Sequence, residues 1–224
     1  MTRRIRQPHV LAAVLLALGV AACSGTPSNS GTPATPSGSA AGSGHTERFA
    51  FDESTGLPAT ATVFDGAWTV RAESGTGSVP NALCQTGTAT FPAIGLTTTN
   101  YRDGVFGVRF KPISGKEDQA AGIIFRVVDR DNYYILRANA LEGNVNFYTY
   151  ISGKRTVLQE GSGTVTAGTW HELRVEITGN TMSGYLDGNR VVTATDATFG
   201  SGRVGLWTKS DSQTCFDDLN VTAR

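Results

Sequence analysis

Residues 170–177 read WHELRVEI, and in this stretch polar and apolar side chains alternate. Successive side chains of a β-strand point to opposite faces of its sheet, so alternation of this kind predicts a strand. Residues 104–112, GVFGVRFKP, alternate in the same way. Each of these two strands has one face that is suited to a hydrophobic core and one that is suited to water.

Similar short segments, rich in Val, Ile, Phe, Tyr and Thr, recur to the end of the chain, and no long helical period competes with them. The strands that we expect are 104–112, 120–128, 133–140, 145–151, 170–177, 181–186, 191–194, 203–208 and 215–222. About ten strands in one domain need two packed sheets. The sequence therefore predicts an all-β protein, an antiparallel two-sheet β-sandwich over residues 49–224.

Turn residues separate these strands and support antiparallel pairing. Asp187-Gly188 is a strong hairpin signal, because a primed turn needs the positive φ angles that Asp-Gly supplies. Glu142-Gly143-Asn144, Ser152-Gly153-Lys154 and Gly179-Asn180 indicate three further reversals.

The first 22 residues predict an export signal. Arg3, Arg4 and Arg6 precede an apolar stretch, residues 10–20, that is too short to span a bilayer. The small residues that follow and Cys23 resemble a bacterial lipobox, which implies that Cys23 is acylated and becomes the new N-terminus. The expected location is a bacterial cell membrane, with the lipid-anchored protein facing the extracytoplasmic side. An ordinary secretory signal that is cut nearby is the alternative.

Residues 23–48 form the expected tether. From Ser24 to Gly44 the chain is almost wholly Ser, Gly, Thr, Pro and Ala. Such a composition cannot bury enough apolar surface to order itself. We therefore expect a disordered segment between the lipidated cysteine and the sandwich.

Charge and cysteine content restrict the possible partners. Lys+Arg and Asp+Glu both total 19, and no basic cluster occurs outside the signal, so we expect no nucleic-acid partner. The protein that we expect is a monomer. With Cys23 assigned to lipid, Cys84 and Cys215 remain, and an even pair in an exported protein favours a disulfide. Two separate buried thiols are the alternative.

Several segments together resemble a known bacterial type: AGIIFR at 121–126, DNYY at 131–134, WHELRV at 170–175, LDG at 186–188, GLWT at 205–208 and FDDL at 216–219. Over residues 49–224 the chain resembles the concanavalin A-like lectin/glucanase jelly rolls, near the LamG-like and 3-keto-disaccharide hydrolase domains. The resemblance implies a jelly roll. It leaves function open, because this architecture hosts glycosidases, lectin-like binders and structural modules.

The sequence favours a protein that is not an enzyme, and it assigns no catalytic residue. Laminarinase-like relatives carry Glu-x-Asp-x-x-Glu on one strand, and no segment here has that spacing. Within the expected domain His171 is the one histidine, and it shares a strand face with Leu173 and Val175. We expect it to be a hydrogen-bonded structural histidine rather than a base.

A binding surface is the better candidate. Sugar sites combine aromatic rings with planar polar groups, and two neighbouring expected strands supply both on one face. The ligand-binding residues that we expect are Arg126, Tyr133, Arg137, Asn139, Asn146, Tyr148 and Trp207, with Asn144 and Lys209 beside them. A solvated sheet face is the alternative for the polar set, and a buried tryptophan is the alternative for Trp207.

Acidic residues near both ends of the domain suggest a structural calcium ion. In related jelly rolls the chain ends meet, and a calcium ion can be held there by acidic oxygens. We hypothesise such a site, with Asp218 and Asp52 as ligands.

Three functions follow from these observations. The favoured one is a surface-anchored lipoprotein that binds carbohydrate or cell-envelope glycan without cleaving it. The second is a glycan-processing hydrolase of the 3-keto-disaccharide hydrolase type. The third is a structural or protein-interaction module that has no small ligand.

Overall fold

The computed structural model describes residues 42, 44–51, 56–75 and 80–224. The predictions for the signal, for Cys23, for most of the tether and for Asp52 fall outside these residues. The described residues belong to one compact unit, Pro36–Arg224. Among the described residues, no helix is long and apolar enough to cross a membrane.

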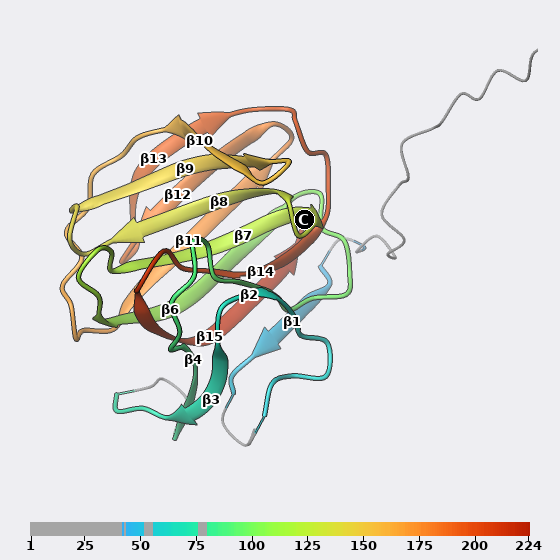
Figure 1. Cartoon of the computed structure of the whole chain (residues 1–224). Coiled ribbons are helices and arrows are strands. Elements are labelled where there is room, and N and C mark those ends of the chain that lie inside the picture. The colour runs from blue at the N-terminus through green and yellow to red at the C-terminus, as the bar shows by residue number, and fades with distance from the viewer. Residues whose placement is uncertain (1–41, 43, 52–55, 76–79) are drawn as a thin grey trace, which may run out of the picture. The chain divides into compact units, whose positions relative to one another are not determined.

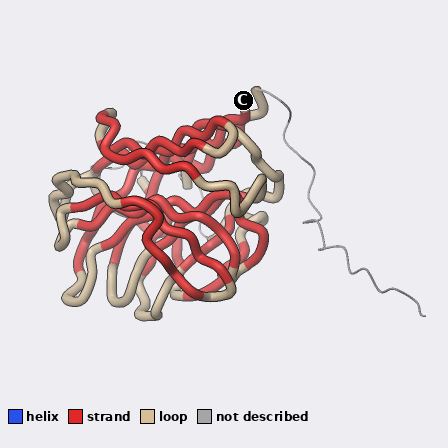
Figure 2. Tube along the Cα trace, turned by 90° about the horizontal axis from the view of Figure 1, so that it is seen from above, coloured by secondary structure: helices blue, strands red, loops and turns tan. Residues whose placement is uncertain are grey.

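The described residues form two antiparallel sheets that pack face to face, and they contain no helix (Figures 1 and 2). The predicted all-β sandwich is therefore confirmed. The eight-stranded sheet contains β1 (Thr46–Phe49), β3 (Trp68–Ala72), β4 (Asn81–Gln85), β6 (Gly104–Ser114), β11 (His171–Thr178), β12 (Thr181–Leu186), β13 (Asn189–Thr195) and β15 (Gln213–Ala223). The seven-stranded sheet contains β2 (Thr62–Asp65), β5 (Ala93–Gly95), β7 (Ala120–Asp129), β8 (Asn132–Asn139), β9 (Asn144–Ile151), β10 (Lys154–Gln159) and β14 (Arg203–Trp207).

In both sheets some neighbouring strands are consecutive in the chain and form hairpins, whereas others are far apart in the chain. The eight-stranded sheet runs β13-β12-β11-β6-β15-β4-β3, and β1 pairs with β15 (Figure 1). The seven-stranded sheet runs β10-β9-β8-β7-β14-β5-β2. The strand β1 begins at Thr46, three residues before the domain start that the sequence suggested.

The main core lies between the two sheets. The apolar residues of β6 and β11 that alternate in the sequence, such as Phe106 and Val175, are fully buried there. Residues of β7, β8 and β9, among them Phe125, Leu136 and Phe147, cover them from the other sheet. Burial of apolar area at roughly 25 cal/mol per Å² makes this contact the main source of stability.

Two of the predicted turns occur as tight two-residue hairpins. Asp187 and Gly188 have φ angles of 49° and 80° and join β12 to β13. Ser152 and Gly153, with φ angles of 50° and 78°, join β9 to β10 in the same manner. Positive φ at both central residues is the geometry that matches the twist of antiparallel strands.

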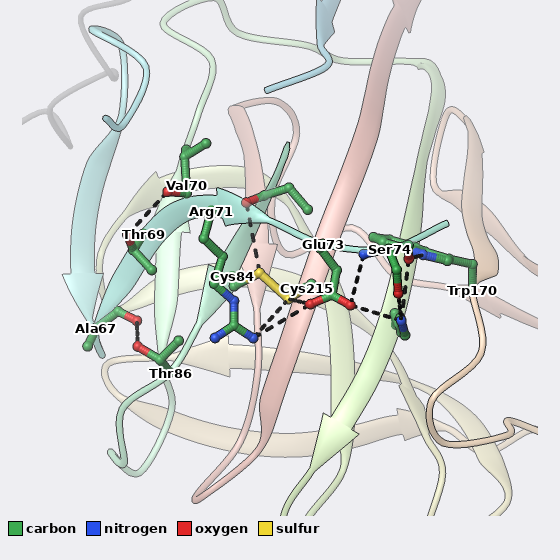
Figure 3. The surroundings of a disulfide bond; sticks show 12 residues. Ala67, Thr69, Val70, Arg71, Glu73, Ser74, Cys84, Thr86, Trp170 and Cys215 are labelled. Carbon is green, nitrogen blue, oxygen red and sulfur yellow. Dashed lines mark hydrogen bonds and ion pairs between the residues drawn. A yellow bond between two sulfur atoms is a disulfide. The ribbon is translucent and has the colours of Figure 1, made fainter. Parts of the chain in front are cut away.

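The predicted disulfide between Cys84 and Cys215 is present, with a sequence separation of 131 (Figure 3). The two residues face each other in the register of β4 and β15. Figure 3 shows Arg71 and Glu73 beside the bridge, and Lys111 Nζ donates to Glu73 Oε1 at 2.9 Å. The bond joins the early strand β4 to the last strand, β15, close to the β3 edge of the eight-stranded sheet.

Candidate functional site

The outer face of the seven-stranded sheet carries most of the residues that the sequence suggested. Antiparallel pairing sets Arg137 opposite Asn146 and Tyr133 opposite Tyr150, so the polar faces of β8 and β9 meet as expected. Gly122 lies in register between Arg137 and Trp207, and it places no side chain between them. A second hydrophobic cluster, which we call the outer cluster, covers this face and consists of Ala93, Ala120, Ile124, Val127, Tyr133, Ile135, Tyr148, Tyr150 and Trp207.

Aromatic rings dominate the outer cluster. The rings of Tyr133 and Tyr150 stack with centroids 4.7 Å apart, and Phe91 stacks on Trp207 at 5.7 Å. Phe91 also meets Tyr150 edge to face at 5.6 Å. Burial raises the pKa of the Tyr133 and Tyr150 hydroxyls, so both stay neutral at physiological pH.

Trp207 lies at the bottom of the outer face rather than at its rim. Its exposed fraction is 0%, because Phe91 and Arg155 cover it. The alternative that the sequence left open, a buried tryptophan, is therefore correct, although the ring packs outside the sandwich core.

Arg155, which the sequence did not suggest, completes this aromatic group. It comes from β10, an edge strand that the sequence pattern did not predict. Its guanidinium carbon lies 4.5 Å from the Tyr148 ring centroid, 5.1 Å from Phe91 and 5.4 Å from Trp207. A cation over several ring faces is attracted by each of them.

The carboxylates of this face are held by cations and amides. Glu142 accepts from Arg137 at 2.7 Å and from Asn144 at 2.9 Å. Burial opposes ionisation of Glu142, but these two hydrogen bonds outweigh it and lower the pKa of the carboxyl. Asp118 is fully buried and is bound by Asn139 and by Lys209.

Asn139 and Asn146 serve the fold locally. Asn139 Oδ1 accepts from the backbone N–H of Leu141 at 2.9 Å and so shapes the turn after β8. Asn146 Oδ1 accepts from the backbone N–H of Gly161 at 3.0 Å, and its amide donates to the Tyr148 hydroxyl at 3.2 Å. Both side chains lie on the expected face, but their oxygens are already used.

Three donors on the same face lack acceptors. Among the described residues, the buried side-chain nitrogen or oxygen atoms without a hydrogen-bond partner are Arg137 Nε, Arg155 NH1 and Trp207 Nε1. Trp207 Nε1 lies near the Tyr133 hydroxyl but not in hydrogen-bonding geometry. Because folded proteins pair nearly all buried polar atoms, three exceptions in one aromatic group indicate a site rather than a defect.

Two hollows open beside these residues, and Phe91 lines both. The smaller, of about 160 Å³, also contacts Phe64, Asp65, Thr90, Ala93, Arg130, Asp131, Tyr133, Tyr150 and Gly153. The larger, of about 540 Å³, also contacts Thr88, Ala89, Thr90, Glu117, Lys209 and Ser210. The loop that carries Phe91 therefore separates two depressions on the outer face.

Arg126 does not lie with the other expected residues. It has a φ angle of 48° at an irregularity in the β7–β8 pairing, which turns its side chain away from the outer face. Its guanidinium donates to the carbonyl oxygens of Arg102, Gly179 and Phe199. Burial lowers its pKa, and Asp103, at 3.4 Å, opposes the shift. Its role is to hold loops together.

Asp218, the expected calcium ligand, lies on the outer face of the other sheet. Its carboxylate forms an ion pair with Arg48 at 2.5 Å and lines a hollow of about 380 Å³. Within the described part of the chain, the only group of three potential metal ligands is Glu73, Cys84 and Cys215. The two sulfurs of that group are bonded to each other, so they are not free to act as thiolate ligands.

His171 has the structural contacts that we expected. Its Nδ1 donates to Asp187 Oδ2 at 2.7 Å, and its Nε2 accepts from the backbone N–H of Thr166 at 2.9 Å. Both ring nitrogens are used, and they fix a loop and a hairpin on the eight-stranded sheet.

The two-sheet fold and the aromatic, polar outer face define a lectin-like, carbohydrate-binding β-sandwich domain. Residues 97–224 match the sequence profile of the galactocerebrosidase C-terminal lectin domain, and the chain belongs to that family. No protein with a curated function is significantly similar in sequence.

Solved structures share the fold at low sequence identity. The carbohydrate-binding module CBM66 from Bacillus subtilis is 20% identical, with a TM-score of 0.62 over 73% of this chain and 96% of that one. A putative glycosyl hydrolase from Parabacteroides distasonis is 14% identical, with a TM-score of 0.52 over 80% of this chain and 100% of that one. The GH43 protein BlXynB from Bacillus licheniformis is 16% identical, with a TM-score of 0.56 over 79% of this chain and 39% of that one.

Proposed function

We propose that the domain binds a glycan on the outer face of its seven-stranded sheet, in the hollows on the two sides of Phe91. The observation that carries the proposal is the group of three unpartnered buried donors among aromatic rings. Sugar hydroxyls are acceptors for such donors, and the apolar side of a sugar ring stacks on aromatic faces. A glycan that binds here supplies acceptors to these donors.

Hydrolysis is not favoured by the same residues. A general acid for glycoside cleavage needs a raised pKa, whereas the pKa of Glu142 is lowered. Asp118 is fully buried and is held by Lys209 and Asn139. Glu142 and Asp118 therefore serve to orient cations and amides.

The proposed setting of the domain is the extracytoplasmic surface of a bacterial membrane. The lipobox-like sequence that ends at Cys23 and the Ser/Gly/Thr/Pro-rich stretch after it support this setting. The chain reaches the sandwich through β1, which pairs within the eight-stranded sheet. The proposed glycan site lies on the other sheet.

The decisive experiment is glycan-array binding by the full chain in detergent, followed by titration of the best oligosaccharide. Phe91→Ala removes the half-buried ring that both hollows share, and we expect its affinity to fall at least tenfold, which corresponds to about 1.4 kcal/mol. Val63→Ser, an exposed apolar residue of β2 that lines neither hollow, is the matched control.

Two results would contradict the proposal. Absence of binding to any oligosaccharide would favour a structural or protein-interaction module, and binding that Phe91→Ala leaves unchanged would move the site to another face. Release of product from plain or 3-keto-disaccharides would instead favour the hydrolase.

A further inference from the structure

Arg155 is a cation of the outer face that forms no ion pair with a carboxylate. The ion pairs there join Arg137 to Glu142 at 2.7 Å and Lys209 to Asp118. Among the described residues, no ion pair reaches Arg155, and its NH1 atom is buried without an acceptor. A guanidinium does not lose its proton in a protein, so the charge remains.

The surroundings of Arg155 compensate this charge only in part. Burial lowers the pKa of Arg155 and the neighbouring Arg137 adds to that effect, whereas Tyr148 and the more distant carboxylates of Asp118 and Glu142 oppose it without outweighing it. The rings of Phe91, Tyr148 and Trp207 attract the cation, but a ring face is a poor substitute for a hydrogen-bond acceptor. A buried donor that is left unpaired costs about 1–3 kcal/mol.

A second donor faces the same aromatic ring. Arg137 is 1% exposed, and its guanidinium carbon lies 5.3 Å from the centroid of Tyr148. Its NH2 donates to Glu142 and Asn144, whereas its buried Nε has no acceptor. Two guanidinium groups that meet at one ring, each with a donor unused, match an anionic acceptor, and a planar carboxylate matches a guanidinium best.

Other charges indicate where such an anion would lie. Asp65 and Asp131 line the smaller hollow beside Arg130, and Glu117 lines the larger one beside Lys209, whose charge is paired with Asp118. Neither hollow therefore offers an excess of positive charge to an acid. Arg155 lies against Phe91, the aromatic residue that both hollows share. An acidic group is therefore best placed between the hollows, while neutral sugar rings extend into them.

We propose that the glycan contains a uronic acid, and that its carboxylate binds Arg155, with Arg137 as the second donor. This inference rests on the proposed glycan-binding function and names the class of sugar. A sulfate ester is the other common source of anionic oxygen on a glycan, and the experiment separates the two.

The test compares matched probes by calorimetric titration of the full chain. The probes are oligomers of galacturonate, glucuronate and mannuronate, the methyl ester of each, and sulfated and unsulfated neutral galactan oligomers. We expect one uronate to bind at least tenfold more tightly than its ester, and we expect its affinity to fall as salt rises.

Two variants assign the preference to Arg155. Arg155→Gln should abolish the difference between acid and ester, and Arg155→Lys, which keeps the charge without the fork, should retain part of it. Lys154→Gln removes the exposed charge of the preceding residue on the same strand and should bind like the parent. Equal thermal midpoints establish that each variant is folded.

Each remaining outcome overturns a different statement. Esters or neutral oligomers that bind as tightly as the acids would end the uronate assignment and leave glycan binding intact. A preference for the sulfated oligomers would replace carboxylate by sulfate. An acid preference that survives Arg155→Gln would exclude Arg155 as its source. No binding to any probe would end both the uronate and the sulfate assignment, while glycan binding itself is decided by the array.

Discussion

Arg126 and Arg155 are both arginines of the seven-stranded sheet, and the structure uses them in opposite ways. Three backbone carbonyls surround the guanidinium of Arg126, so its donors are occupied and it fixes loops. Arg155 contacts aromatic rings and keeps a donor without an acceptor. The sequence suggested Arg126 and missed Arg155, because residue type alone does not show whether acceptors surround a side chain.

The carboxylate of Asp211, which lies in a loop outside the strands, predicts that the stability of the fold falls at low pH. Asp211 accepts backbone N–H groups of Lys116 at 2.6 Å, Glu117 at 3.0 Å and Asp118 at 3.1 Å. These hydrogen bonds, that of Lys116 first, lower the pKa of Asp211. The folded pKa lies below the unfolded value near 3.9, so the stabilisation is present above that value and is lost as pH falls through the folded pKa.

Asp211→Asn should therefore lower the urea midpoint at pH 7, and the difference from the parent should shrink towards pH 3. Urea unfolding followed by tryptophan fluorescence at both pH values measures this, with the exposed Glu160→Gln as the control. A deficit of the same size at both values would show that the carboxylate's charge is not what stabilises the loop.

At the scale of the elements, alternation located the strands that carry the core. The expected strand 181–186 coincides with β12, and most other ends differ from the structure by one or two residues. The strands β1, β2, β3 and β5 have only three to five residues each, too few for a period to be visible. They form because longer neighbours provide an edge to which they hydrogen-bond.

On the outer face, too, alternation in the sequence predicted only part of the structure. Alternation correctly placed Tyr133, Arg137, Asn146 and Tyr148 on one face of β8 and β9. It could not show that a loop from Phe91 and the edge strand β10 cover that face, because both contacts join residues distant in the sequence. The bulge after Phe125 also reversed the expected direction of Arg126.

The cross-strand disulfide between β4 and β15 should contribute measurably to stability. Cys84→Ser combined with Cys215→Ser opens a loop with a sequence separation of 131. We expect the free energy of unfolding to fall by about 2–5 kcal/mol, because the unfolded chain regains conformational freedom. Thermal unfolding of the double variant, and of the parent with and without reductant, measures this.

The two bonded sulfurs are fully buried in the folded protein, so reductant should act on the parent slowly and mainly after unfolding. An unchanged midpoint in the double variant would mean that the hydrogen bonds of the eight-stranded sheet alone hold β4 against β15.

At the scale of the whole molecule, attachment through Cys23 is the prediction with the clearest cellular readout. Cys23→Ser removes the thiol that a lipobox acylates, so the protein should move from the membrane fraction to the soluble fraction. Fractionation together with metabolic labelling by radioactive palmitate measures both effects. Lipidation would be contradicted if parent and variant both stayed in the membrane fraction and neither carried the label.

The pairing of β1 with β15 also places the two ends of the sandwich side by side. The backbone N–H of Gly44 donates to the carbonyl oxygen of Ala223 at 3.1 Å, and the N–H of Ala223 donates to the carbonyl oxygen of His45 at 2.8 Å. A linker of a few residues would span that gap, and new termini could be opened at the Asp187-Gly188 turn without cutting a strand. The domain is thus suited to circular permutation and to insertion within a loop of another protein.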